Sequence, residues 1–227
     1  MKQKYDVHAE QTIDTLNHLL DQGITKCGLL IRHSERFFTD DAGMEPFMGL
    51  TQAGKTYAED LGKALGPKPS IKLCSSFFGR CIETAYLIDK GYTQTHHTQL
   101  AHNCTDPMLA PFYIKDIEKA IHMVEDQGSD LFLRHWFDNE IDETIMENAR
   151  TSADRLCDFM IQQVKTLPEN TICICISHDW NIFPIKEFKM GISHESSGHV
   201  GYLDGVIFFE KQGRTYVVNY QSDPLPV

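Results

Sequence analysis

The sequence predicts a three-layer α/β/α sandwich built around a mostly parallel central sheet. Short apolar runs at 26–31, 71–74 and 171–176 have the length and composition of buried strands. Apolar residues at helical spacing lie between these runs, so strands and helices alternate along the chain, which favours parallel strands joined by right-handed crossovers. With 227 residues and 41% hydrophobic composition, the chain can form one domain, 1–227, with a substantial core.

The N-terminal third contains two predicted helices on either side of the first strand. Segment 6–20 carries apolar residues at spacings of three and four, so 1–25 is predicted to be an N-terminal helical extension. Segment 37–50 is rich in aspartate, glycine and proline and is predicted to be a loop. Thr51 can then cap a helix that runs to Leu65.

The middle of the chain is harder to interpret. After the strand at 71–74, a helix is predicted from 80 to 90, with Gly91 as its end. The periodicity weakens over 92–139, where prolines and histidines interrupt the chain, although 113–125 has the pattern of a helix. We expect this segment to form a small helical and loop insertion that acts as a cap.

The C-terminal third returns to regular patterns. A long helix is predicted over 141–167, ended by Pro168. The strand at 171–176 follows, and segments 206–210 and 215–220 are predicted to form a terminal hairpin.

Composition narrows the classes of partner. A formal net charge of -11 and a pI near 5.4 argue against nucleic acid and anionic membranes as partners. No stretch approaches the ~18 apolar residues of a membrane span, and charged residues interrupt the first twenty positions, so we expect a cytoplasmic protein. The odd count of seven cysteines favours buried reduced thiols over a disulfide framework.

Three predicted strands are each followed by charged or imidazole side chains. In a parallel sheet, the carboxyl ends of the strands meet at one edge, where open α/β folds bind their ligands. Phosphoryl transfer needs a nucleophile, several positive donors and an acid for the leaving group. These residue types occur after the strands at 26–31, 71–74 and 171–176 as Arg32, His33 and Arg36, then Arg80, then His178 and Asp179.

Three sequence elements resemble the histidine phosphatase superfamily, which includes phosphoglycerate mutases, acid phosphatases and phytases. Residues 32–35 are similar to its Arg-His-Gly-Glu signature, with Ser34 in place of glycine. Residues 50–54 match its Leu-Thr-x-x-Gly element, and 76–85 resemble its Ser-Pro-Leu-x-Arg-Ala-x-Gln-Thr-Ala element. The resemblance implies a catalysis that needs no metal or cofactor, with His33 as the nucleophile and these phosphate ligands: Arg32, Arg36, Arg80 and His178.

The proton donor is less directly indicated. His178-Asp179 resembles the His-Asp pair of the acid phosphatase branch, which implies Asp179 as the acid. The mutase branch instead uses a glutamate soon after a leucine, but Ala110 and Pro111 follow Leu109 here. Asp179 can also be the N-cap of a helix over 180–188. Two carboxylates of the insertion stay open as alternatives: Asp106 and Asp116.

Other residues near these motifs have structural interpretations beside the functional ones. Arg36 can form a salt bridge with Glu35 or Asp40 rather than bind phosphate. A group of four possible zinc ligands matches no standard spacing, so no metal site is predicted: His96, His97, His102 and Cys104. Three aromatic residues can line a leaving-group pocket or pack in the core: Phe37, Phe38 and Trp180.

The function expected from these residues is metal-independent hydrolysis of phosphomonoesters through a phosphohistidine intermediate. The substrate is expected to be a small phosphate ester or a phosphoprotein. Three alternatives remain: a phosphoglycerate mutase-like phosphomutase, a phosphohistidine protein phosphatase, and a module that binds phosphate without chemistry.

Overall fold

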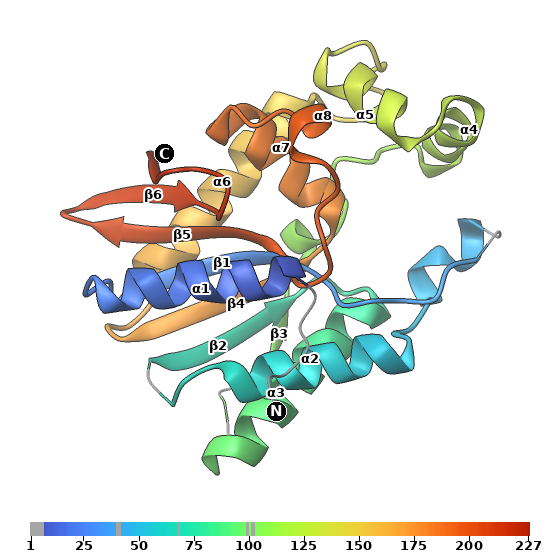
Figure 1. Ribbon diagram of the computed structural model, residues 1–227. Helices are drawn as coiled ribbons and strands as arrows, with labels where there is room; N and C mark the ends of the chain where they lie inside the picture. The colour runs from blue at the N-terminus through green and yellow to red at the C-terminus, as the bar shows by residue number, and fades with distance from the viewer. Residues whose placement is uncertain (1–6, 40–41, 68, 99, 101–102) are drawn as a thin grey trace.

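The computed structural model describes residues 7–39, 42–67, 69–98, 100 and 103–227. Their strands form one seven-stranded mixed sheet in the order β3-β2-β4-β1-β5-β6-β7 (Figure 1). The predicted three-layer α/β/α class is confirmed. In chain order the strands are β1 (Lys26–Arg32), β2 (Ser70–Ser75), β3 (Cys104–Thr105), β4 (Thr171–Ser177), β5 (Gly205–Lys211), β6 (Arg214–Val218) and β7 (Leu225–Pro226).

The register of the parallel strands brings the predicted site residues to one edge. β4 lies between β1 and β2, parallel to both, and β3 is parallel to β2. Arg32 at the end of β1 pairs with Ser177 at the end of β4, and Ser75 at the end of β2 pairs with Ile176. The sheet turns antiparallel beyond β1, where β5 and β6 form the predicted hairpin.

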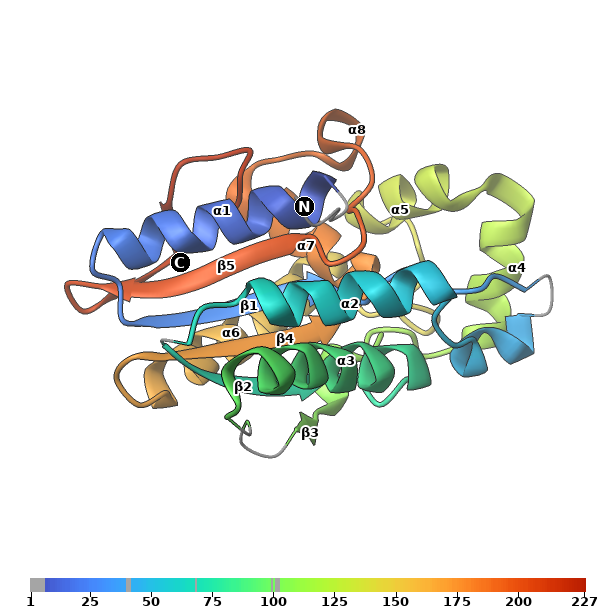
Figure 2. The same cartoon turned by 60° about the horizontal axis from the view of Figure 1, so that its bottom comes forward.

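Helices cover both faces of the sheet. α1 (Val7–Asp21), α2 (Gln52–Ala64) and α3 (Gly79–His96) pack on one face, and α6 (Ala149–Thr166) and α7 (Asp179–Met190) on the other (Figures 1 and 2). The predicted N-terminal helix is α1, which belongs to the helical layer that it forms with α2 and α3.

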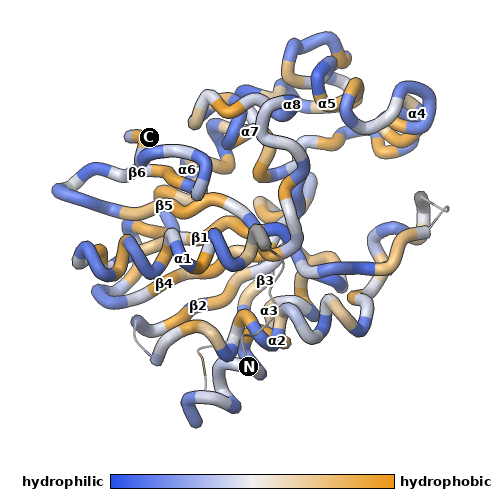
Figure 3. The backbone as a smooth tube through the Cα atoms, in the orientation of Figure 1, coloured by the Kyte–Doolittle hydropathy of each residue, from blue (hydrophilic) through white to orange (hydrophobic). Residues whose placement is uncertain are grey.

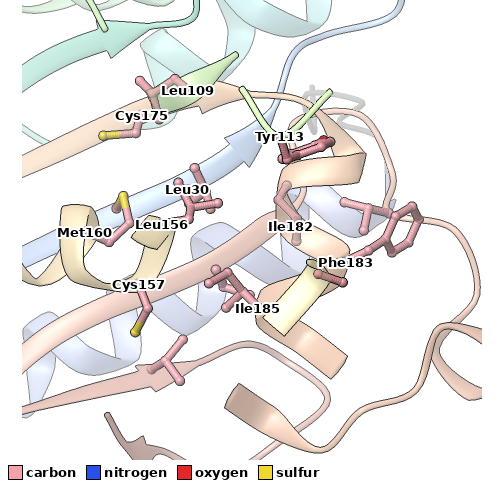
Figure 4. Close-up of a cluster of buried hydrophobic side chains, with 14 of the residues drawn as sticks. Leu30, Leu109, Tyr113, Leu156, Cys157, Met160, Cys175, Ile182, Phe183 and Ile185 are labelled. Carbon is pink, nitrogen blue, oxygen red and sulfur yellow. The ribbon is translucent and has the colours of Figure 1, made fainter. Parts of the chain in front are cut away.

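Alternation along each strand divides the core in two. In β1, Leu29 and Ile31 face the layer of α1 to α3, whereas Leu30 faces α6 and α7. In Figure 4, Leu30 lies among Leu156 and Met160 from α6. Figure 3 accordingly shows the strands mostly in hydrophobic colours. The buried strand pattern of the sequence therefore reflects burial on both faces.

Smaller elements gather beyond the carboxyl ends of the parallel strands. Figure 2 shows α4 (Ile117–Gln127) and α5 (Ser129–Phe137) past the ends of β1 and β4. The loop after β1 contains η1 (Ala42–Phe47), and two further short helices are η2 (Pro107–Leu109) and α8 (His194–Ser197). Among the described residues, no helix combines the length and apolar character needed to cross a membrane.

Three predicted helix boundaries are wrong. The helix predicted at 113–125 begins only at Ile117, where the Asp116 side chain caps α4. α3 continues past Gly91 to His96, because Gly91 serves close packing rather than helix termination: a Cβ there would lie 2.0 Å from the carbonyl oxygen of Glu59 in α2. α6 begins at Ala149, eight residues after the predicted start, since the Asn148 side chain accepts a hydrogen bond from the backbone of Thr151 and caps the helix.

Candidate active site

His33 directly follows β1 and is held in one orientation. Its backbone N–H donates to the Ser177 carbonyl at 2.9 Å, and its side chain is only 2% exposed. Nδ1 lies 2.8 Å from the Ser34 carbonyl, and Nε2 lies 3.1 Å from Nε of Arg80. Since a guanidinium only donates and a carbonyl only accepts, Nδ1 carries the proton and Nε2 carries the lone pair. His33 therefore presents an unprotonated nitrogen toward Arg80.

Arg80 and His178 complete the buried centre. Arg80, in the first turn of α3, donates from Nη1 to the Glu45 carbonyl at 2.8 Å and lies 3.4 Å from Nδ1 of His178 through Nη2. Nε2 of His178 lies 3.1 Å from the Ser76 hydroxyl. The two imidazole rings are 5.5 Å apart between centroids. Strands β1, β2 and β4 thus each contribute to one cluster, as the parallel register requires.

The electrostatics of this centre favour neutral histidines. Burial lowers the pKa of His33 well below its usual value, and His178, Arg80 and Arg32 lower it further. Burial likewise lowers the pKa of His178, with Arg80 and Arg32 adding to the effect. A neutral imidazole at neutral pH is the nucleophilic form.

Arg32 lies at the end of β1 with its guanidinium directed at the cluster. Nη1 donates to the Val200 carbonyl at 2.7 Å, and Nη2 lies 3.0 Å from Oδ2 of Asp179. The group also stacks over the Tyr202 ring at 4.5 Å. Its Nε is buried and has no hydrogen-bond partner among the described residues, so one donor remains for an anion.

Arg36 has a different partner from those that the sequence suggests. Its Nη1 lies 2.8 Å from Oε2 of Glu45, whereas Glu35 accepts from the Thr51 hydroxyl at 2.6 Å and Asp40 lies outside the described residues. Nε of Arg36 is also buried without a partner among the described residues. Arg36 lowers the pKa of both His178 and Arg80 after larger effects of burial, so its charge reaches the cluster.

The candidate acids differ in their surroundings. Asp179 is the first residue of α7, where its Oδ1 accepts from the backbone of Trp180 at 3.0 Å and its side chain is 27% exposed. Asp106 caps η2, and Asp116 caps α4 and pairs with Lys119 at 2.8 Å. Of the three, Asp179 is the one paired with a predicted phosphate ligand.

The Leu-Thr-x-x-Gly element supports the loop that follows His33. The Thr51 hydroxyl caps α2 by accepting from Gly54 N–H at 3.0 Å and donates to the Glu35 carboxylate. A Cβ on Gly54 would lie 2.0 Å from the Glu35 carbonyl oxygen, so only glycine allows this approach. The Ser34 hydroxyl in turn donates to the Gly54 carbonyl at 2.8 Å. This bond gives Ser34 a structural use where the family has glycine.

An apolar cavity of about 260 Å³, which we call the aromatic pocket, adjoins the cluster. Phe77 and Phe78 form one side, and six residues between Pro107 and Ile117 form the other. The Phe78 ring packs 4.9 Å from the His178 ring and lies 5.0 Å from the Arg80 guanidinium. A second, polar cavity of about 310 Å³, at Asp130 and α8, contains none of the predicted site residues.

Sequence reasoning missed several residues of this site. Phe37, Phe38 and Trp180 do not line the aromatic pocket; the first two are 58% and 69% exposed, and Trp180 stacks on Phe132. Glu45 and Tyr202 contact the arginines from loops whose position no local pattern predicts. Phe78 stands at the leucine position of the third element, and its place after a strand is the available signal.

Positive charge is concentrated at this site in a chain of net charge -11. Arg80 donates to the unprotonated nitrogen of His33, and the charges of Arg32 and Arg36 act on the neighbouring His178. Such a local reversal of charge suits an anion. Among the described residues, no group of three or more histidine, cysteine or carboxylate side chains could hold a metal.

The chain has the fold of the histidine phosphatase superfamily. It is similar over 89% of its length to 96% of a mycobacterial glucosyl-3-phosphoglycerate phosphatase, with a TM-score of 0.59 and 15% identity. It is similar over 86% to 92% of a phosphoglycerate mutase from Bacillus anthracis (TM-score 0.58, 16% identity). A phosphoserine phosphatase from Entamoeba histolytica matches 85% of this chain over 95% of its own (TM-score 0.54, 16% identity). No family model and no curated protein matches the sequence.

The resemblance predicted from the sequence elements is therefore confirmed at the level of the fold. The neighbours include both phosphatases and a mutase, so the fold is compatible with either activity.

Proposed function

We propose that this protein hydrolyses phosphomonoesters without a metal, through a phosphohistidine formed on His33. The observation that carries the proposal is the lone pair on Nε2 of His33, which faces the guanidinium of Arg80 at 3.1 Å. Arg80 links His33 to His178, and Arg32 lies beside Asp179, so we assign Arg32, Arg80 and His178 to the equatorial oxygens of a phosphoryl group. Arg36, paired with Glu45, is proposed as the outermost ligand.

The reaction proceeds in two steps, phosphoryl transfer to His33 and hydrolysis of the phosphohistidine. Nε2 of His33 attacks phosphorus, the bond from phosphorus to the ester oxygen breaks, and that oxygen takes the proton of Asp179. Water then attacks the phosphohistidine, its proton returns to Asp179, and the phosphorus–nitrogen bond breaks to release phosphate. The 3.0 Å contact between Asp179 and Arg32 supports this role, because it keeps the carboxyl beside a proposed phosphate ligand.

We further propose that 1–227 is a single catalytic domain and that, within the expected insertion 92–139, α4 and α5 act as the cap, because the end of α3 and β3 belong to the sandwich itself. Arg134 of α5 supports this proposal because it bonds to Glu187 of α7 at 3.2 Å and to Glu195 of α8 at 2.7 Å. These bonds hold α5 next to the helix that carries Asp179. A cap fixed in this way would limit the site to esters that fit beneath it.

Phosphate release separates hydrolysis from phosphoryl return to a second hydroxyl. We expect purified protein to release inorganic phosphate from a panel of phosphomonoesters, and His33→Ala to abolish release. Formation of an isomeric ester from 3-phosphoglycerate without net phosphate release would instead assign a mutase. Unchanged release by His33→Ala would overturn the proposal.

A further inference from the structure

The aromatic pocket adjoins the proposed phosphate site. Phe78 belongs to both, since it lines the pocket and packs against Arg80 and His178. On the opposite side, Phe112 packs 5.3 Å from Tyr113, whose hydroxyl donates to Asn181 of α7 at 3.0 Å. The pocket thus extends from the phosphate ligands toward the helix that begins with Asp179.

The lining of the pocket is apolar throughout. Every residue that lines it is a phenylalanine, proline, alanine or isoleucine. Ala110 and Pro111 are among them, at the place after Leu109 where the mutase branch would have its glutamate. No charged side chain of the described residues lines this cavity, so nothing there would pair with a carboxylate of a substrate.

Two large side chains of the lining are accessible from solvent. Phe77 is 57% and Ile117 55% exposed, so a group that enters the cavity can contact both. The volume of about 260 Å³ is slightly below the roughly 300–1,000 Å³ of pockets for drug-sized ligands. It is adequate for one aryl ring or a short alkyl chain.

We infer that the aromatic pocket selects phosphate esters whose leaving group is apolar, and that Phe77 and Ile117 determine this selectivity. The inference rests on the proposed hydrolase function and deepens it. The names of two neighbours refer to phosphoglycerate and phosphoserine, esters of the charged alcohols glycerate and serine, and the apolar lining here is unsuited to such groups.

A matched pair of primary alkyl esters tests the inference. The two leaving alcohols have similar basicity and need the same acid catalysis, so a difference in kcat/KM reports how the pocket binds them. Hexyl phosphate should exceed its analogue with a terminal carboxylate by at least tenfold in kcat/KM. From ethyl to hexyl phosphate, kcat/KM should rise about fourfold for each methylene that becomes buried. Equal efficiency for the matched pair, or a preference for the carboxylate, would overturn the inference.

Variants at exposed positions assign the selectivity to the pocket. Phe77→Ala should flatten the rise with chain length, and Ile117→Lys should reverse the preference toward the carboxylate ester. Ile82→Lys is the matched control, since Ile82 is 45% exposed on α3 and does not line the pocket. Unchanged preference in Phe77→Ala and Ile117→Lys would contradict their role. If wild-type protein hydrolyses neither ester and leaves para-nitrophenyl phosphate intact, the proposed function itself fails, and the inference with it.

Discussion

Oδ2 of Asp179 lies 3.0 Å from Nη2 of Arg32, so the candidate proton donor and a candidate phosphate ligand form an ion pair. In the proposed mechanism, a phosphate that binds Arg32 would displace Asp179 from this ion pair and free its carboxyl for proton transfer to the leaving oxygen.

Replacement of Asp179 tests this role through the leaving group. A general acid matters most when the leaving oxygen is basic, so Asp179→Asn should slow hydrolysis of alkyl phosphates by about 100-fold or more and spare para-nitrophenyl phosphate. Asp106→Asn, which alters a helix cap, should show no such selectivity. Equal loss for both substrates in Asp179→Asn would indicate that the residue only positions α7.

Anion inhibitors and chelators test how the phosphate charge is neutralised. If guanidinium groups do this work, chelators should leave the rate unchanged, whereas vanadate or tungstate should inhibit in competition with substrate. Steady-state rates with each additive provide the measurement. A rate that disappears with chelator and returns with a divalent ion would contradict the account.

The lowered pKa values of His33 and His178 predict a loss of stability in acid. Below about pH 6.5 the two histidines are protonated in the unfolded chain but stay neutral in the folded protein. The free energy of unfolding should therefore fall as pH falls. Each histidine contributes up to about 1.4 kcal/mol per pH unit between its unfolded and folded pKa values.

Urea unfolding of wild type and His178→Asn at pH 7 and pH 5.5 measures this effect. The difference in unfolding free energy between the two pH values should be smaller in His178→Asn. An equal difference in both proteins would show that His178 titrates normally in the fold.

The close approach of Gly54 to the Glu35 backbone predicts that Gly54 and Gly79 tolerate replacement by alanine differently. Gly54→Ala should destabilise the protein by about 1–3 kcal/mol or more and reduce activity, since the added Cβ displaces the loop after His33. Gly79→Ala is the matched control, because a Cβ there meets nothing within 4 Å. Thermal unfolding of both variants provides the comparison, and equal midpoints would contradict the packing argument.

Sequence reasoning succeeded where local pattern and sheet geometry act together. Apolar runs identified β1, β2 and β4, and the rule that parallel strands end at one edge predicted that His33, Arg80 and His178 would meet. Thr51 was identified as a cap because its hydroxyl acts on the next turn of its own chain.

Sequence reasoning failed where contacts depend on distant backbone. Gly91 looked like a helix end, but its partner is the Glu59 carbonyl in another helix. Glu45 reaches Arg36 from a loop, and the aromatic pocket combines the turn after β2 with the insertion. α5 lies outside the predicted helices, although its buried residues recur at helical spacing and form one face of a nine-residue helix: Phe132, Leu133, Trp136 and Phe137.

Covalent trapping tests the central claim most directly. Protein mixed briefly with a ³²P-labelled phosphomonoester and quenched in alkali should carry label on His33, which acid then releases. His33→Ala should acquire none. Label on a serine or an aspartate, or turnover without any labelled protein in rapid-quench experiments, would contradict the phosphohistidine mechanism.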